Sequence, residues 1–150
     1  MKLPFADQSF DAVMALESIS HMPDRQQALT EACRVLRPGG RIVLTDAFER
    51  APRKETRHPA IDTFCDNFMV TMADIDDYAA LLHRSGLRLR SLLDITEQTT
   101  QRTCQELAKQ VPGGSRPAGI DPTHLPDQWH PSDMLGVDEF GYLLVVAERP

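Results

Sequence analysis

Two residues of this chain could carry out proton-transfer chemistry, His21 and Asp46, and each follows a segment with the pattern of a buried strand. An imidazole with an ordinary pKa of about 6.5 can accept a proton at neutral pH, so His21 is a candidate general base. Asp46 could orient the imidazole ring and stabilise its charged form. Structural interpretations stay open, because His21 could only close the loop before a helix and Glu17 could be a solvated residue at a strand end.

A metal site would gather His21 and Asp46 with one of the other histidines, His58, His124 or His130. None of these residues shows a ligand spacing such as His-x3-His, so we expect no metal. The three cysteines are odd in number and far apart, which fits neither a disulfide framework nor a zinc site. We expect them to be reduced. The three are Cys33, Cys65 and Cys104, and we expect Cys33 and Cys104 to be buried on helix faces.

The composition is ordinary for a soluble globular protein. The chain has 150 residues, of which 41% are hydrophobic and 25% charged, so we expect a single domain. A net charge of -6 argues against binding to nucleic acid, because that affinity depends on cations that neutralise phosphates. The cluster Arg50, Arg53, Lys54 and Arg57 is a local exception, which we interpret as a solvated loop. No apolar leader or membrane-spanning run occurs, so we expect a cytoplasmic protein with no membrane partner.

The elements that must position His21 and Asp46 begin with a strand and a helix. The segment from Phe10 to Leu16 is apolar except for Asp11 and follows turn residues, which predicts a buried strand. A helix begins near Pro23-Asp24, where proline and an acidic group suit the first turn. Its apolar face is predicted from the spacing i, i+3, i+4, i+7 of Leu29, Ala32, Cys33 and Leu36.

A tight turn and a second strand follow. Pro38 pushes Arg37 out of helical geometry, and Gly39-Gly40 can supply the positive φ angles of a helix end and turn. Arg41 to Leu44 is short and rich in β-branched residues, as expected of a parallel strand buried on both faces. Asp46 then lies at the carboxyl end of the strand, where open α/β sheets bind their ligands.

The rest of the chain continues the alternation of helices and strands. Apolar residues from Ile61 to Met69 repeat at helical spacing, and Asp74 opens a further helix that ends at Gly86. That helix buries Tyr78, Leu81 and Leu82. Residues 87 to 95 alternate as in a strand, with Leu87, Leu89, Ser91, Leu93 and Ile95 on one face.

The last third of the chain contains a helix, an irregular segment and a strand. Thr99 or Thr100 is the expected cap of a helix whose apolar face comprises Cys104, Leu107, Ala108 and Val111. Prolines and glycines from about 112 to 133 predict a loop. Phe140 to Ala147 has the pattern of a strand.

Three segments together give the chain a family resemblance: Leu3 to Val13, Glu17 to Asp24 and Arg34 to Asp46. They resemble class I S-adenosylmethionine-dependent methyltransferases, in the branch that methylates small natural products. The resemblance implies an α/β fold, a partial Rossmann-like methyltransferase fold with a mostly parallel sheet and helices on its faces. It also implies that the strand from Phe140 is antiparallel and inserted between the second and third parallel strands.

The same resemblance implies where the reactants bind. His21 and Asp46 are expected to face the substrate pocket, and Ala15, Leu16 and Glu17 to contact S-adenosylmethionine, the cofactor of the complete enzyme. The family's first strand and Gly-rich loop have no counterpart in this sequence. We therefore expect the amino-terminal half of the sheet to be missing, this chain alone to be inactive, and the bare edge of the strand from Phe10 to Leu16 to favour self-association.

Two functions from different classes follow. One is a part of an enzyme that methylates a small-molecule acceptor, most simply at oxygen. The other is a non-catalytic module that kept the methyltransferase fold and binds a partner protein, since a fold does not fix a function.

Overall fold

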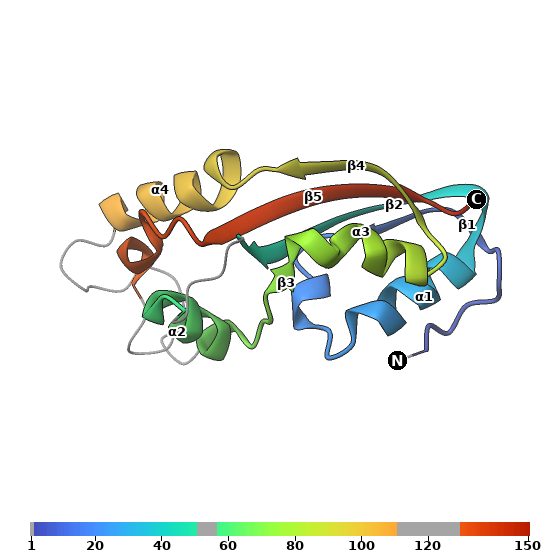
Figure 1. Cartoon of the computed structure of the whole chain (residues 1–150), viewed down its shortest axis with the longest axis horizontal. Coiled ribbons are helices and arrows are strands. Elements are labelled where there is room, and N and C mark those ends of the chain that lie inside the picture. Colours follow the sequence, from blue (N-terminus) through green and yellow to red (C-terminus); the bar gives the residue numbers. More distant parts are fainter. Residues whose placement is uncertain (1, 51–56, 111–129) are drawn as a thin grey trace.

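The structure is a computed structural model that describes residues 2–50, 57–110 and 130–150. Its strands are β1 (Phe10–Ala15), β2 (Leu36–Glu49), β3 (Ala73–Asp74), β4 (Arg88–Asp94) and β5 (Phe140–Glu148). Its α-helices are α1 (Arg25–Val35), α2 (Pro59–Phe68), α3 (Ile75–Arg84) and α4 (Arg102–Gln110). Shorter helical turns are η1 (Ile19–His21), η2 (Glu97–Gln101) and η5 (Pro131–Met134). Figure 1 shows α1 and α3 along one face of the sheet and α2 and α4 beyond one end of it.

The sheet has the strand order β1-β2-β5-β4. β1 and β2 are parallel, whereas β5 runs antiparallel to both of its neighbours, β2 and β4. The predicted insertion of the last strand between two parallel strands is therefore confirmed. β3 adds two parallel pairs to the carboxyl end of β2.

The turn predicted at Pro38-Gly39-Gly40 is wrong, because these residues belong to β2, which begins at Leu36. The Gly39 N–H donates to the carbonyl of Arg149 at 2.8 Å, so this segment pairs with the end of β5. Gly39 has a φ of +78°, and a Cβ on Gly40 would lie 2.8 Å from the carbonyl oxygen of Arg37. Glycine thus permits a tightly bent strand here, where a tight turn was expected.

The prediction that residues 10 to 16 form a buried strand is also wrong in its burial. Among the described strands, β1 pairs with β2 alone, and it therefore lies at an edge of the sheet. Met14 is 73% exposed, and Leu16, just beyond the strand, is 49% exposed. An apolar strand at the sheet edge exposes alternate side chains together with its unpaired backbone groups.

Helices α1 and α3 begin where acidic caps were expected. The Asp24 side chain accepts a hydrogen bond from the Gln27 N–H at 2.9 Å, and Asp74 accepts from the Asp76 N–H at 3.0 Å. Tyr78 and Leu82 of α3 are fully buried against the sheet, as predicted, and Leu81 is partly buried. Cys33 of α1 is only partly buried, which corrects the expectation that it is buried.

Strand β4 departs from simple alternation because its register shifts between Leu89 and Ser91. A bulge of this kind moves the following side chains to the opposite face. Leu92 therefore packs against the core, whereas Leu93, predicted to share a face with Leu89, is 51% exposed.

The helix after β4 starts before the predicted cap. Residues Glu97–Gln101 form a π-helical turn that leads into α4. Asp94 accepts from the Thr96 N–H at 3.0 Å, while the Thr99 hydroxyl donates back to the Ile95 carbonyl at 2.6 Å. Cys104 is buried, as predicted.

The helices and strands pack together through two clusters of buried apolar side chains. The larger lies between the sheet and α1 and α3, and the smaller joins α2, α4 and the ends of β2 and β5. Most of the loop predicted at 112–133, including His124, lies outside the described residues. Arg53, Lys54 and Val111 also lie outside them. No helix among the described residues is long and apolar enough to cross a bilayer.

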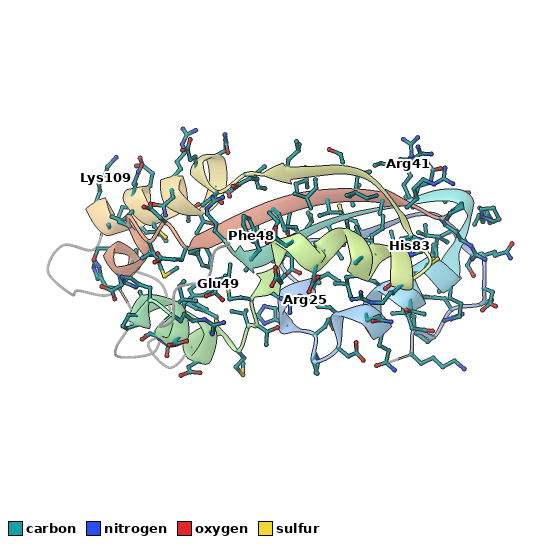
Figure 2. The ribbon with its side chains drawn as sticks, in the orientation of Figure 1. Arg25, Arg41, Phe48, Glu49, His83 and Lys109 are labelled. Carbon is teal, nitrogen blue, oxygen red and sulfur yellow. The ribbon has the colours of Figure 1, made fainter. Side chains whose placement is uncertain are left out.

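The basic cluster near residue 50 is more structured than a solvated loop where the structure describes it. Arg57 forms an ion pair of 2.8 Å with Glu49. Glu49, labelled in Figure 2, is 6% exposed and ends β2. Arg57 also contacts Asp62 of α2 at 3.2 Å, and Arg50 pairs with Asp94. These arginines tie the end of the sheet to α2 and to the start of η2.

Candidate functional site

A cavity of about 320 Å³ lies among η1, α2, α4 and the ends of β2 and β5. Its volume is at the lower end of the usual range for small-molecule sites, roughly 300–1,000 Å³. Phe64, Phe68, Val70, Leu107 and Phe140 give it largely apolar walls. Polar side chains also line it, among them Glu17, His21 and Tyr142. An apolar cavity with a few convergent polar groups is the usual form of a ligand site.

Glu17, Thr45 and Tyr142 form a hydrogen-bonded trio, of which Glu17 and Tyr142 line this cavity. The Tyr142 hydroxyl donates to Glu17 Oε1 and is also hydrogen-bonded to Thr45 Oγ1 at 2.8 Å. The Glu17 N–H donates to the same Thr45 oxygen at 3.1 Å. Glu17 has a φ of +51°, a conformation that non-glycine residues rarely adopt and that often occurs at functional sites. Burial and the neighbouring Glu17 raise the pKa of Tyr142, so its hydroxyl stays protonated at neutral pH.

His21 is the last residue of η1 and lines the same cavity. Its Nδ1 lies 3.3 Å from the carbonyl oxygen of Met69, which can only accept a hydrogen bond. In this contact Nδ1 is the donor, so Nε2 is the ring nitrogen that can accept a proton. Met69 is the C-cap of α2 and has a φ of +52°, which turns its carbonyl into this position. The ring is thus set in the tautomer that a general base requires.

Asp46 does not support the His21 ring, which corrects the predicted partnership. It lies inside β2, because pairing with β5 continues to Glu49, and it is 1% exposed. Arg25 donates to its two carboxylate oxygens, from Nε at 2.8 Å and from Nη2 at 3.0 Å. The Tyr78 hydroxyl donates at 3.1 Å. Burial raises the pKa of Asp46, and Arg25 opposes that shift.

Arg25 connects this buried carboxylate to the loop that carries His21. Its Nη1 donates to Thr71 Oγ1 at 2.5 Å, and its Nη2 donates to the Thr71 carbonyl. Thr71 in turn donates its N–H to the Ser20 carbonyl at 2.9 Å. Arg25, labelled in Figure 2, stands at the start of α1 between the sheet and these two loops. Hydrogen bonds through Arg25 and Thr71 therefore connect Asp46 to Ser20, the residue before His21.

The three residues predicted to contact the cofactor end β1 or follow it. Ala15 pairs with Leu44 in the sheet, Leu16 is 49% exposed, and Glu17 alone of the three lines the cavity. Sequence reasoning missed Tyr142 and Thr45. Tyr142 had a usable signal, because it is the one polar side chain in the apolar run from Phe140 to Ala147.

A second hollow, of about 570 Å³, opens beside η2 and the loop before β5. Arg50 on its lining already has protein partners, because it forms an ion pair with Asp94 and donates to Thr96 Oγ1 at 3.1 Å. Burial acts to raise the pKa of Asp94, but the hydrogen bonds from Arg50 and Thr96 outweigh it, so that the net shift is downward. A paired arginine and a stable carboxylate indicate a structural contact at this place.

Comparison with known proteins gives relatives along the whole chain. The Methyltransferase domain family matches residues 1–44. The chain is 35% identical to Methyltransferase GfsG of Streptomyces halstedii over an alignment of 167 residues. The alignment covers 100% of this chain and 54% of that protein. It is 40% identical to 27-O-demethylrifamycin SV methyltransferase of Amycolatopsis mediterranei, over 66% of this chain and 37% of that protein.

Solved structures agree in fold. Geranyl diphosphate C-methyltransferase from Streptomyces coelicolor A3(2) superimposes with a TM-score of 0.77 at 18% identity, over 99% of this chain and 51% of that one. The chain spans about half the length of the first relatives that it matches, GfsG among them.

Proposed function

We propose that this chain, which belongs to the class I S-adenosylmethionine-dependent methyltransferases of the natural-product branch, supplies the acceptor-binding part of an enzyme that methylates a small-molecule hydroxyl. The observation that carries the proposal is the cavity of about 320 Å³ with the oriented His21 ring on its lining. Relatives named as O-methyltransferases along the chain support oxygen as the acceptor atom.

His21 is the proposed general base. With Nδ1 held by the Met69 carbonyl, Nε2 can take the proton of an acceptor hydroxyl as the methyl group arrives. Much of the acceleration comes from holding the two reactants in line, which the apolar walls of the cavity provide for the acceptor. Asp46 is a positioning residue in this proposal, because it fixes Arg25 and so the loop before His21.

We propose that the cofactor binds at the carboxyl end of β1, around Ala15, Leu16 and Glu17. S-adenosylmethionine, when bound, supplies an activated methyl group on a positively charged sulfonium. The Glu17 carboxylate suits a cation, and it borders the cavity at the point where β1 ends. Reacting atoms approach to about 3 to 3.5 Å, so one carboxylate can lie beside both reactants.

The test of the base is methyl transfer in a protein that joins this chain to a complete cofactor-binding half. His21→Ala should lower kcat about a hundredfold or more with a hydroxylated acceptor. His83→Ala is the matched control, since His83 lies on the exposed side of α3, away from the cavity (Figure 2), and it should leave kcat unchanged. A near-normal rate in His21→Ala would leave placement alone as the mechanism. Failure of every acceptor would favour a non-catalytic, partner-binding module.

Chain 1–150 by itself is proposed to bind S-adenosylmethionine weakly. Its sequence has no Gly-rich loop of the kind that brings backbone N–H groups close to this cofactor, and Gly39-Gly40 lies at the opposite end of β2 from the cavity. Losing several hydrogen bonds of roughly 0.5 to 1.5 kcal/mol each moves affinity from micromolar towards millimolar. Calorimetry that gave a dissociation constant of about ten micromolar or tighter would contradict this.

Self-association through β1 is also proposed. The strand has a free edge among the described residues, with Met14 73% exposed, and such an edge is a template for pairing with another strand. Light scattering should detect dimers or larger species at high micromolar concentration. Met14→Lys should shift them towards monomer, because a charged side chain on an edge strand opposes pairing. A stable wild-type monomer would refute the proposal.

A further inference from the structure

We propose that Tyr142 is a specificity-determining residue, which fixes the Glu17 carboxylate so that the cavity accepts a free hydroxyl and disfavours the corresponding methyl ether. The inference rests on the proposed function, whose cavity it uses, and it assigns a task to a residue outside the predicted site. The ligand class is an alcohol or phenol on an otherwise apolar skeleton.

The geometry brings together three elements that are distant in sequence. Glu17 follows β1, Thr45 lies within β2 and Tyr142 lies within β5. The Tyr142 hydroxyl reaches both of the other side chains, with 2.8 Å to Thr45 Oγ1 and a donated hydrogen bond to Glu17 Oε1. Thr45 Oγ1 also accepts the Glu17 N–H at 3.1 Å, which fixes the backbone of Glu17 at its positive φ.

The trio leaves one oxygen of the exposed Glu17 carboxylate free to accept a hydrogen bond from a ligand in the cavity that Glu17 lines. Tyr142 binds Oε1 of Glu17, and Oε2 has no hydrogen-bond partner among the described residues. A carboxylate only accepts hydrogen bonds, so this oxygen can bind the proton of an alcohol but gains nothing from an ether. Phe64, Phe68 and Leu107 on the same cavity provide contact for an apolar skeleton.

The consequence for a methylation reaction is discrimination between substrate and product. In the complex without cofactor the free hydroxyl donates to Glu17, and it must turn from Glu17 to His21 Nε2 before its proton is transferred; the hydrogen bond to Glu17 disappears for good once the oxygen carries a methyl group. The ether also brings an extra methyl group to the polar part of the lining. The cavity should therefore hold the unmethylated compound more tightly than the methylated one.

The experiment uses 2-naphthol and 2-methoxynaphthalene as matched probes, added without cofactor to isotopically labelled chain 1–150 and followed by amide chemical shifts in NMR. Wild type should bind 2-naphthol about tenfold more tightly, as expected for one hydrogen bond to a charged acceptor. Tyr142→Phe removes the hydroxyl that holds Glu17 and should bring the two dissociation constants to within about threefold. Glu17→Gln should weaken the preference similarly.

The control is Thr30→Val, which removes an exposed side-chain hydroxyl of α1 that lies outside the cavity lining. It should leave the preference for 2-naphthol at the wild-type value. An unchanged preference in Tyr142→Phe, or no shifts near the cavity with either probe at millimolar concentration, would overturn the inference.

The two proposals fail separately in this design. If wild type prefers 2-naphthol as expected but the complete protein transfers no methyl group, the Tyr142 inference stands and the proposed function is refuted. Methyl transfer with an unchanged preference in Tyr142→Phe would do the opposite.

Discussion

Arg25→Met should destabilise the protein strongly, because it removes the guanidinium that holds a buried carboxylate. The Asp46 side chain is 0% exposed and Arg25 is 13% exposed, and two hydrogen bonds of 2.8 and 3.0 Å join them. After the substitution, Tyr78 at 3.1 Å remains as a side-chain donor to the carboxylate. Breaking a buried ion pair from one side costs roughly 3–5 kcal/mol. That is a large share of the roughly 5–15 kcal/mol by which native proteins are stable.

The loss should depend on pH with a definite sign. Burial already raises the pKa of Asp46, and without the opposing Arg25 the folded-state pKa rises further. A carboxyl group with a raised folded-state pKa favours folding below its unfolded pKa of about 3.9, and that contribution is lost as the pH rises towards the folded value. Arg25→Met should therefore regain stability as the pH falls below the folded-state pKa of Asp46 towards the unfolded value of about 3.9, by up to ~1.4 kcal/mol per pH unit.

Urea unfolding followed by circular dichroism measures both quantities. Arg90→Met is the matched control, since Arg90 is 46% exposed and its ion pair with Glu148, at 2.6 Å, lies at the surface. It should cost much less and should not recover on acidification, because solvent screens an exposed pair. Equal losses in the two variants, or a loss in Arg25→Met that does not vary with pH, would refute the assignment of a buried, charge-holding pair.

Three further predictions concern the core and the tyrosines. Tyr78→Phe should lower the free energy of unfolding by about 1–3 kcal/mol in urea titrations, because Asp46 loses a buried donor, and an unchanged midpoint would contradict this contact. Gly141→Ala should cost about 1–3 kcal/mol, because its Cβ would overlap the Phe48 ring, and Phe48→Leu should restore part of the loss; an additive double variant would contradict the overlap. Burial raises the pKa of both Tyr78 and Tyr142, so ultraviolet titration should show neither ionising near the ordinary value of about 10 while the protein is folded. Stability should fall above about pH 10, because the unfolded chain releases protons that the folded protein retains.

The elements of the fold could be predicted because their signals are local. Asp24 and Asp74 cap α1 and α3 where an acidic side chain precedes an apolar helical stripe. The position of β5 came from the family resemblance, since sequence pattern alone does not order strands. Errors arose where tertiary pairing decides, as at Gly39-Gly40, which bind the end of β5, and at the β4 bulge, which exposes Leu93.

Two residues of the cavity lining, Glu17 and His21, were singled out from the sequence, but their contacts could not be predicted from it. Position along the chain indicated His21, and the structure places it on the cavity. The partner of Asp46 could not be found this way, because Arg25 and Tyr78 come from helices that the sequence treats as packing elements. Asp46 was read as following a short strand, and the continuation of β2 to Glu49 places it in the buried interior.

The proposed methylation is tested by transfer of a carbon-13 methyl group from S-adenosylmethionine to a hydroxylated small molecule, detected by NMR in a protein that joins this chain to a cofactor-binding half. Leu107→Trp puts an indole on the cavity lining, and Ala80→Trp puts the same ring on the exposed face of α3. A new methoxy signal should appear with wild type and with Ala80→Trp, and it should be absent with Leu107→Trp. Equal transfer by both variants, or a label on nitrogen or carbon, would contradict the proposed function.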